Sequence, residues 1–153
     1  MIGPGDDDPF DLQRFVDAQA ACYGRVVAEL TRGRKESHWS WFIFPQLSGL
    51  GSSAMAARYA ISSLAEASAY LDHPILGARL RECVSAMNRH EGTGAEYILG
   101  HVDALKFRSC LTLFLEISEP DPAFRKALEQ FFGGEPDAMT LSLLGARREE
   151  SRP

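Results

Sequence analysis

The sequence has no long apolar run and no segment typical of export. Its most apolar stretch, residues 39–47, is interrupted by Ser40, Pro45 and Gln46, whereas a membrane span needs roughly 20 mostly apolar residues. The start of the chain has a run of aspartates at positions 6–8 instead of the basic and apolar segments of a secretory signal. We therefore expect a cytoplasmic protein that neither crosses nor binds a membrane.

Cysteine is scarce, and its spacing argues against metal or redox chemistry. Cys22, Cys83 and Cys110 are far apart in the sequence, and no C-x-x-C pair occurs. Each lies within an apolar-periodic segment, which predicts buried reduced thiols in a cytoplasmic protein. The sequence indicates no metal site and no cofactor.

Basic residues are also in the minority. The chain has 16 Lys and Arg against 21 Asp and Glu, a net charge of -5. This balance argues against a general nucleic-acid-binding role, which needs a basic surface. With 153 residues, 45% of them hydrophobic and 24% charged, the composition is that of one globular domain.

Residues that start and stop helices divide the chain into a series of predicted helices. Asp8 followed by Pro9 predicts the start of a first helix that ends at Gly33. Further helices are predicted to begin at or near Ser53, Ser63, His73, Thr93, Asp103, Asp121 and Asp137. The last of them is predicted to end near Leu144, before a frayed charged tail that follows Gly145.

No alternating pattern with hairpin turns occurs, so no sheet is predicted. The ambiguous stretch, residues 37–50, is interpreted as a helical turn that leads into a loop. The predicted fold class is all-α, an irregular single-domain bundle of about six to eight short and medium helices. The domain is predicted to span residues 8–145, with flexible ends at 1–7 and 146–153 and a core filled by aromatic residues.

Gln19 interrupts the apolar stripe of the predicted first helix, one turn from Phe15 and from Cys22. A buried amide without a hydrogen-bond partner costs about 1–3 kcal/mol. Gln19 therefore needs a partner, which is either the backbone of a loop or a bound ligand.

Residues 33–46 form the most unusual segment, because both tryptophans of the chain lie there beside basic side chains. Histidine titrates near neutral pH, so His38 is the candidate general acid or base. Lys35 is a candidate to bind an anion, Trp41 to stack on a planar ring and Gln46 to orient a polar group. The alternative is that the aromatic residues belong to the core and the basic ones to a solvated rim.

Lys106, Arg108 and Ser109 lie in the first turns of the helix predicted to be central. The amino-terminal end of a helix attracts phosphate and carboxylate groups, so these residues are candidate substrate-binding residues. The alternative is that Asp103 pairs with the two cations and no ligand is involved.

Familiar catalytic motifs are missing from the sequence. It has no G-x-S-x-G, no H-E-x-x-H, no GxxxxGK[ST] and no G-x-G-x-x-G. Residues 49–53, Gly-Leu-Gly-Ser-Ser, resemble a phosphate-binding loop only in being rich in glycine and serine ahead of a predicted helix. Whether the chain is an enzyme is therefore left open.

Several segments together resemble a known family. They are residues 8–15, 18–19, 37–39, 42–46, 49–51, 59–61, 73–77 and 112–114, with Asp103 and Lys106. They are similar to the bacterial and fungal family catalogued as domain of unknown function 1810, over roughly Asp8 to Leu144. The resemblance implies a mainly helical fold and no established function. Some members are labelled calpastatin, but a calpastatin-type inhibitor is a disordered repeat chain and this sequence predicts a globular core.

Our first hypothesis is that the chain binds or acts on a phosphorylated small molecule, such as a nucleotide or an ADP-ribose-like compound. Its pocket is expected to bring together Gln19, the His38–Gln46 segment and the start of the Lys106 helix. The alternative is a non-catalytic module that binds a protein or peptide through the aromatic block 39–44. A third possibility is a structural subunit of an oligomer, and the sequence predicts no oligomeric state.

Overall fold

The described part of the chain folds as a set of helices joined by short loops. The structure, a computed structural model, describes residues 7–117 and 121–150. Within these residues the only pairing of the β type is an isolated parallel bridge between Leu47 and Ile61. The helices are α2 (Gln13–Ala20), α3 (Tyr23–Arg32), α4 (Ser40–Ile43), α5 (Ala54–Arg58), α6 (Leu64–Asp72), α7 (Leu76–Asn88), α8 (Ala95–Leu99), α9 (His101–Leu115), α10 (Pro122–Phe132) and α11 (Ala138–Glu150).

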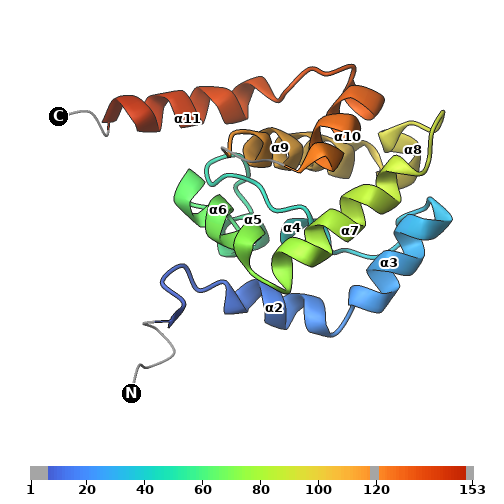
Figure 1. The fold of residues 1–153 in the computed structure, drawn as a ribbon, viewed down its shortest axis with the longest axis horizontal. Helices are drawn as coiled ribbons and strands as arrows, with labels where there is room; N and C mark the ends of the chain where they lie inside the picture. The colour runs from blue at the N-terminus through green and yellow to red at the C-terminus, as the bar shows by residue number, and fades with distance from the viewer. Residues whose placement is uncertain (1–6, 118–120, 151–153) are drawn as a thin grey trace.

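This confirms the all-α fold class, although the described residues contain ten helices and not six to eight. Helices α7 and α9 form the middle of the bundle. Helix α9 packs against α8, α10 and α11 and contacts α4 and α6, and α7 packs against α3, α6 and α10. Figure 1 shows α7 crossing the front of the molecule, α2 along its lower edge and α11 along its upper edge.

Aromatic side chains fill the core, as the sequence predicts. The ring centroids of Phe44 and Phe107 are 4.6 Å apart, and those of Tyr70 and Phe114 are 5.6 Å apart. Both phenylalanines of α9 are fully buried, and the second half of that helix is apolar on nearly all sides. The arrangement confirms that α9 is a central helix.

The predicted first helix is two helices. Helix α2 ends at Ala20 and α3 begins at Tyr23, and Cys22 between them has a φ of -133°. The apolar stripe continues across this break, which is why periodicity alone predicts one helix. Gly33 ends α3 as predicted, with a φ of 81° that glycine adopts at little cost.

Asp8 caps the start of α2, but it lies more residues ahead of the helix than predicted. Its carboxylate oxygens accept hydrogen bonds from the backbone N–H groups of Leu12 at 2.7 Å and Gln13 at 2.9 Å. Pro9 therefore lies in a turn ahead of the helix and not at its first position. Asp11, with a φ of 52°, carries the chain around that turn.

Helices α5, α6 and α10 begin where the sequence predicts. The side chains of Ser53, Ser63 and Asp121 cap α5, α6 and α10. The predicted caps Thr93 and Asp103 are wrong. Helix α8 begins after Gly94 and α9 begins after Gly100, so Asp103 lies within the first turn of α9 and its carboxylate has other partners.

Helix α11 continues past Gly145, where the sequence predicts its end, to Glu150. Arg147 accounts for the extension, because its guanidinium donates to the backbone oxygens of Ser48 at 2.6 Å and Ser62 at 2.9 Å. These bonds tie α11 to the loops on both sides of α5. Asp137 accepts from the N–H of Thr140 at 3.1 Å and caps the helix as predicted.

Candidate functional site

A surface hollow of about 490 Å³ lies where the loop before α5 meets the first turns of α9 and the start of α11. We call it the Lys106 groove. Its volume is in the range of about 300–1,000 Å³ that is usual for small-molecule sites. It is lined by Trp41, Gln46, Leu50, Gly51, Ser52, Ser53, Ala56, Val102, Leu105, Lys106, Ser109, Asp137 and Met139. The structure thus brings together four predicted site residues, Trp41, Gln46, Lys106 and Ser109.

Lys106 belongs to a cluster of three charged side chains. Its Nζ donates to Asp103 Oδ1 at 3.1 Å, and Lys35 Nζ lies 2.8 Å from Asp103 Oδ2. Two ammonium groups and one carboxylate leave one positive charge in excess. The side chain of Lys35 is 6% exposed, and those of Lys106 and Asp103 are each 19% exposed, so solvent reaches the cluster at Lys106 and Asp103 more than at Lys35.

The two lysines also keep Asp103 ionised. Burial of this carboxyl group by itself would raise its pKa. The hydrogen bonds and positive charges of Lys35 and Lys106 outweigh burial and lower the pKa. Asp103 is therefore ionised at neutral pH and pairs with both lysines.

Trp41 forms an aromatic wall beside Lys106. The Nζ of Lys106 lies 4.5 Å from the centroid of the Trp41 ring, which is a cation–π contact. Trp41 is half-buried, whereas Trp39, Phe42 and Phe44 are buried in the core. Within the aromatic block 39–44, Trp41 is therefore the aromatic side chain that solvent or a ligand reaches.

A second, smaller hollow of about 210 Å³ shares the wall formed by Trp41, Gln46, Gly51 and Ala56. We call it the Tyr59 hollow, after the ring that also lines it. A Cβ atom at position 51 would lie 2.7 Å from the Cβ of Ala56, so this shared wall requires glycine there.

Backbone hydrogen bonds to Ile61 hold the loop that carries Gln46 in place. Ile61 N–H donates to Gln46 O at 2.8 Å, and Ser48 N–H donates to Ile61 O at 2.8 Å. Within the described residues, the side-chain amide of Gln46 has no hydrogen-bond partner, although it lines both hollows. A fixed backbone with an unused amide is suited to hold a ligand.

The hydroxyl group of Ser109 makes hydrogen bonds within the chain. Its Oγ lies 3.1 Å from Leu105 O and 3.1 Å from Asp137 Oδ2. The residue is 6% exposed. Ser109 therefore fixes the position of Asp137, which brings a carboxylate to the wall of the groove.

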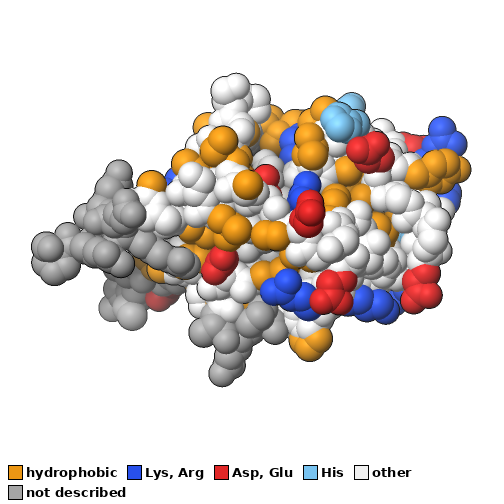
Figure 2. All heavy atoms as spheres, turned by 90° about the horizontal axis from the view of Figure 1, so that it is seen from above, with side chains coloured by type: hydrophobic (Ala, Val, Ile, Leu, Met, Phe, Trp, Pro, Cys, Tyr) orange, Lys and Arg blue, Asp and Glu red, His pale blue; other side chains and the backbone are white. Residues whose placement is uncertain are grey.

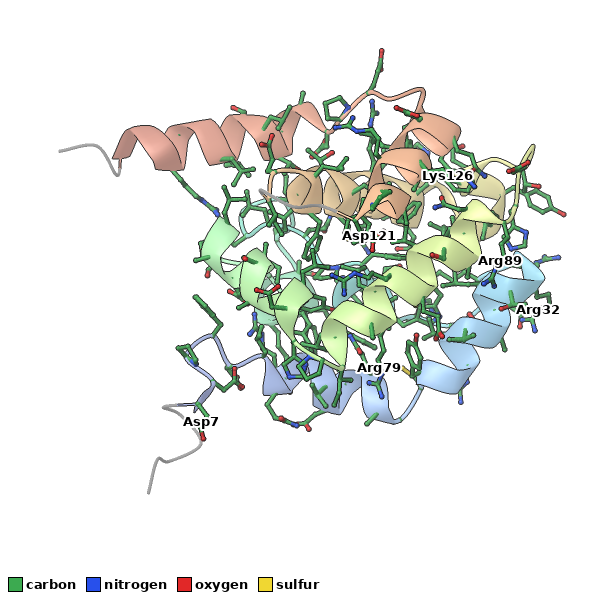
Figure 3. All side chains as sticks on the ribbon, in the orientation of Figure 1. Asp7, Arg32, Arg79, Arg89, Asp121 and Lys126 are labelled. Atoms are coloured by element: carbon green, nitrogen blue, oxygen red, sulfur yellow. The ribbon has the colours of Figure 1, made fainter. Side chains whose placement is uncertain are left out.

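Gln19 does not reach the groove, which corrects the expectation of one pocket shared with Lys106. Its Nε2 donates to Phe42 O at 2.7 Å and to the hydroxyl of Tyr70 at 3.2 Å. Its Oε1 accepts from Arg79 at 3.3 Å, and Arg79 extends from α7 toward the lower edge of the molecule in Figure 3. Gln19 is 1% exposed, so its partners are those of a core amide.

His38 and Arg108 also lie outside the groove. His38 is exposed on the loop between α3 and α4 and lines neither hollow. Arg108 Nε donates to Glu135 O at 2.8 Å, and its Nη2 lies 3.3 Å from the Glu135 carboxylate. The guanidinium group of Arg108 thus binds the loop between α10 and α11.

Sequence reasoning missed Glu29, which shapes the loop that carries Lys35. Its carboxylate accepts from the N–H groups of Glu36 at 2.7 Å and Ser37 at 2.9 Å and from the Ser37 hydroxyl. Burial would raise its pKa, but these bonds and one from Trp39 outweigh burial and lower the pKa to about 2. The signal was present in the sequence, because Glu29 lies on the apolar stripe of α3.

The described residues hold neither a cluster of metal ligands nor a helix suited to span a membrane. Over residues 7–117 and 121–150, no group of three or more His, Cys, Asp or Glu side chains is placed to hold a metal ion. No helix in these ranges combines the length and the apolar character that a bilayer span needs.

Comparison with known proteins gives a family and a fold. A solved structure, the conserved hypothetical protein Rv1873 from Mycobacterium tuberculosis, is 51% identical, with a TM-score of 0.88 over 90% of this chain and 99% of that one. None of the curated proteins compared with the chain matches it. The family described as protein of unknown function (DUF1810) matches residues 9–144. As the sequence resemblance implies, the chain belongs to this DUF1810 family.

Proposed function

We propose that the Lys106 groove binds a small molecule that carries a phosphoryl group, such as a nucleotide or an ADP-ribose-like compound. One observation carries the proposal: the excess positive charge of the Lys35–Asp103–Lys106 cluster lies beside the ring of Trp41. An ammonium group attracts a phosphate, and an indole face stacks on a planar ring.

Polar and apolar groups around Lys106 support the same ligand class. The amide of Gln46 and the hydroxyl of Ser52 offer hydrogen bonds to sugar or ring atoms. Leu50, Leu105 and Met139 surround them with apolar surface, which lowers the local dielectric and strengthens the attraction between Lys106 and an anion. The proposal concerns binding, because His38, the candidate general acid or base, lies outside the groove.

A second candidate is the binding of a peptide, and the apolar rim of the groove favours it. Val102 is 63% exposed, Leu105 50% and Met139 58%. Exposed apolar side chains that gather around a hollow often mark a protein-binding site. The face seen in Figure 2, viewed from the side of α11, shows hydrophobic side chains between charged ones. In this case Trp41 is the aromatic residue of block 39–44 that contacts the peptide.

Thermal unfolding with a library of nucleotides and sugar phosphates tests the first candidate. We expect at least one phosphorylated compound to raise the unfolding temperature of the wild-type chain, and Lys106→Met to abolish this shift. Lys35 and Asp103 still pair in that variant, so its fold is expected to persist. If every stabilising compound stabilises Lys106→Met equally, the ligand binds elsewhere.

Lys126→Met is the matched control for this experiment. Lys126 is on α10 and lies near Arg89, on the same side of the molecule (Figure 3). It lines no part of the Lys106 groove, and its ion pair with Glu91, at 3.9 Å, is exposed. The ligand shift of Lys126→Met is therefore expected to equal that of the wild type.

A cytoplasmic location is part of the same proposal. Cys83 and Cys110 are buried free thiols, and burial raises the pKa of each. Buried, protonated thiols are typical of proteins in a reducing compartment. Fractionation of cells that express the tagged chain is expected to recover it with the cytosolic proteins.

A further inference from the structure

We propose that the Lys106 groove selects a ligand with a single phosphoryl group, as in a nucleoside monophosphate, and that the planar ring of this ligand occupies the Tyr59 hollow. The inference rests on the proposed function and narrows it to one substrate class. It follows from the charges that reach the groove and from the wall that the two hollows share.

The charged residues that line the groove are one lysine and one aspartate, Lys106 and Asp137. Asp137 Oδ2 accepts hydrogen bonds from Ser109 Oγ and Thr140 N–H, both at 3.1 Å, which hold it at the wall. A phosphate monoester already carries about -1.5 to -2 at neutral pH, more than the single ammonium group of Lys106 neutralises. The additional negative charge of a diphosphate or triphosphate would meet the carboxylate of Asp137, which repels it.

Lys35, Arg108 and Arg147 make their contacts outside the groove. Lys35 is 6% exposed and is paired with Asp103. Arg108 binds the backbone oxygen of Glu135, and Arg147 binds the backbone oxygens of Ser48 and Ser62. Among the described residues, Lys106 is therefore the cation that lines the groove, and a polyphosphate finds no second one there.

The Tyr59 hollow is suited to a flat group attached to the phosphorylated part. It lies across the wall of Trp41 and Gln46 from the Lys106 groove, and Ala57 and Ala60 line it with small side chains. The Trp41 ring offers a stacking face, and the unused amide of Gln46 offers one donor and one acceptor to the edge of a ring. A ligand that spans this wall contacts Lys106 with one end and the hollow with the other.

Isothermal titration of the full chain, without divalent cations, tests the selection for one phosphoryl group. The probes are the mono-, di- and triphosphates of the four common ribonucleosides. We expect one monophosphate to bind at least about tenfold more tightly than its triphosphate. Binding of the monophosphate should also be lost in Lys106→Met.

The possible outcomes separate the two proposals. A triphosphate that binds as tightly as its monophosphate or more tightly, and depends on Lys106, overturns the inference and leaves the proposed function standing. If the ribonucleotides fail to bind but a sugar phosphate binds through Lys106, the inference is again overturned and the proposed function stands. Absence of any Lys106-dependent binding of a phosphorylated compound overturns both.

Asp137→Asn tests the repulsion directly. Asparagine keeps an oxygen that can cap α11 but removes the negative charge. We expect the ratio of monophosphate to triphosphate affinity to fall several-fold, while the unfolding temperature without ligand stays close to that of the wild type. An unchanged ratio in a folded Asp137→Asn variant would show that this carboxylate does not set the selectivity.

Ala57→Leu tests the position of the ring. Ala57 lines the Tyr59 hollow, whereas Ala54, on the same short helix α5, lines neither hollow. We expect Ala57→Leu to lower the affinity for the nucleoside monophosphate about tenfold or more and to leave the affinity for ribose 5-phosphate unchanged. Ala54→Leu should change neither affinity. If Ala57→Leu leaves the nucleotide affinity unchanged, the ring lies elsewhere.

Discussion

The indole Nε1 of Trp39 donates a hydrogen bond to Glu29 Oε1 at 3.1 Å, and both side chains are almost fully buried. The same carboxylate accepts from the backbone of Glu36 and Ser37, so one charge in α3 fastens the whole loop that leads to α4. Lys35 lies in that loop and reaches Asp103 on α9. Glu29 thus supports, from inside the fold, the charge cluster that faces the Lys106 groove.

Replacing Glu29 by alanine is expected to lower the free energy of unfolding by about 3 kcal/mol, because buried donors lose their acceptor. Equilibrium unfolding in urea measures this change. Glu36→Ala is the matched control, since its exposed carboxylate makes only a 3.5 Å ion pair with Arg32. That substitution should cost less than about 0.5 kcal/mol. Equal costs for the two variants would contradict the role of Glu29.

Stability is expected to fall in acid as Glu29 takes up a proton. Its pKa is about 2 in the folded chain, against a value of about 4.3 for glutamate in an unfolded chain. A carboxyl group with a lowered pKa stabilises the fold above its unfolded pKa, and this contribution is lost as the pH falls toward the folded pKa. The loss therefore occurs between about pH 4.5 and pH 2.

Urea unfolding at a series of pH values measures the size of this effect. The folded pKa of Asp103 is also lowered, so this residue adds a loss of the same sign. In Glu29→Gln the dependence on pH should be weaker than in the wild type. A slope between pH 4.5 and pH 2 that is the same in both proteins would refute the assignment to Glu29.

Two glycines within helices are expected to respond to alanine in opposite ways. At Gly77 in α7, an added Cβ would lie 2.0 Å from the backbone oxygen of Leu71, so Gly77→Ala should destabilise the chain by about 2 kcal/mol or more. At Gly24 in α3, no atom lies within 4 Å of the added Cβ. Gly24→Ala should therefore stabilise by about 0.5–1 kcal/mol. Thermal unfolding of both variants checks the pair, and a stabilising Gly77→Ala would contradict the close approach of α6 and α7.

Gln19→Leu is expected to separate stability from ligand binding. The substitution leaves Phe42 O without its 2.7 Å donor and should cost about 1–3 kcal/mol. Affinity in the Lys106 groove should not change, because Gln19 does not line it. The exposed Gln13 serves as the control, and Gln13→Leu should change stability by less than about 0.5 kcal/mol. A loss of ligand affinity in a folded Gln19→Leu variant would show that Gln19 contributes to the binding site.

The predicted fold class rests on local signals, which the sequence carries in full. Ser53, Ser63 and Asp121 cap helices, and Gly33 ends one, because the hydrogen bonds and dihedral angles of these positions involve near neighbours in the chain. The break between α2 and α3 escaped prediction, since the apolar stripe that both helices bury continues through it. Arg147 likewise extends α11 through contacts with residues far away in the sequence.

The candidate site could be predicted only in part. Trp41, Gln46, Lys106 and Ser109 stand out by residue type, and the structure brings them to one groove. His38, Gln19, Lys35 and Arg108 stand out equally, yet each has a different environment. Residue type reports what a side chain is able to bind and does not report which partners the fold places next to it.

The amino-acid sequence by itself determined that this chain is helical, where several of its helices begin and that it belongs to the DUF1810 family, because caps, periodicity and motifs are local properties. Only the tertiary structure decided which polar side chains are available to a ligand. Long-range contacts decide whether a charged or amide group is free to bind a ligand. Asp103 pairs with Lys35, and the backbone oxygen of Phe42 accepts a hydrogen bond from Gln19. Those contacts form only when α2, α4 and α9 pack together.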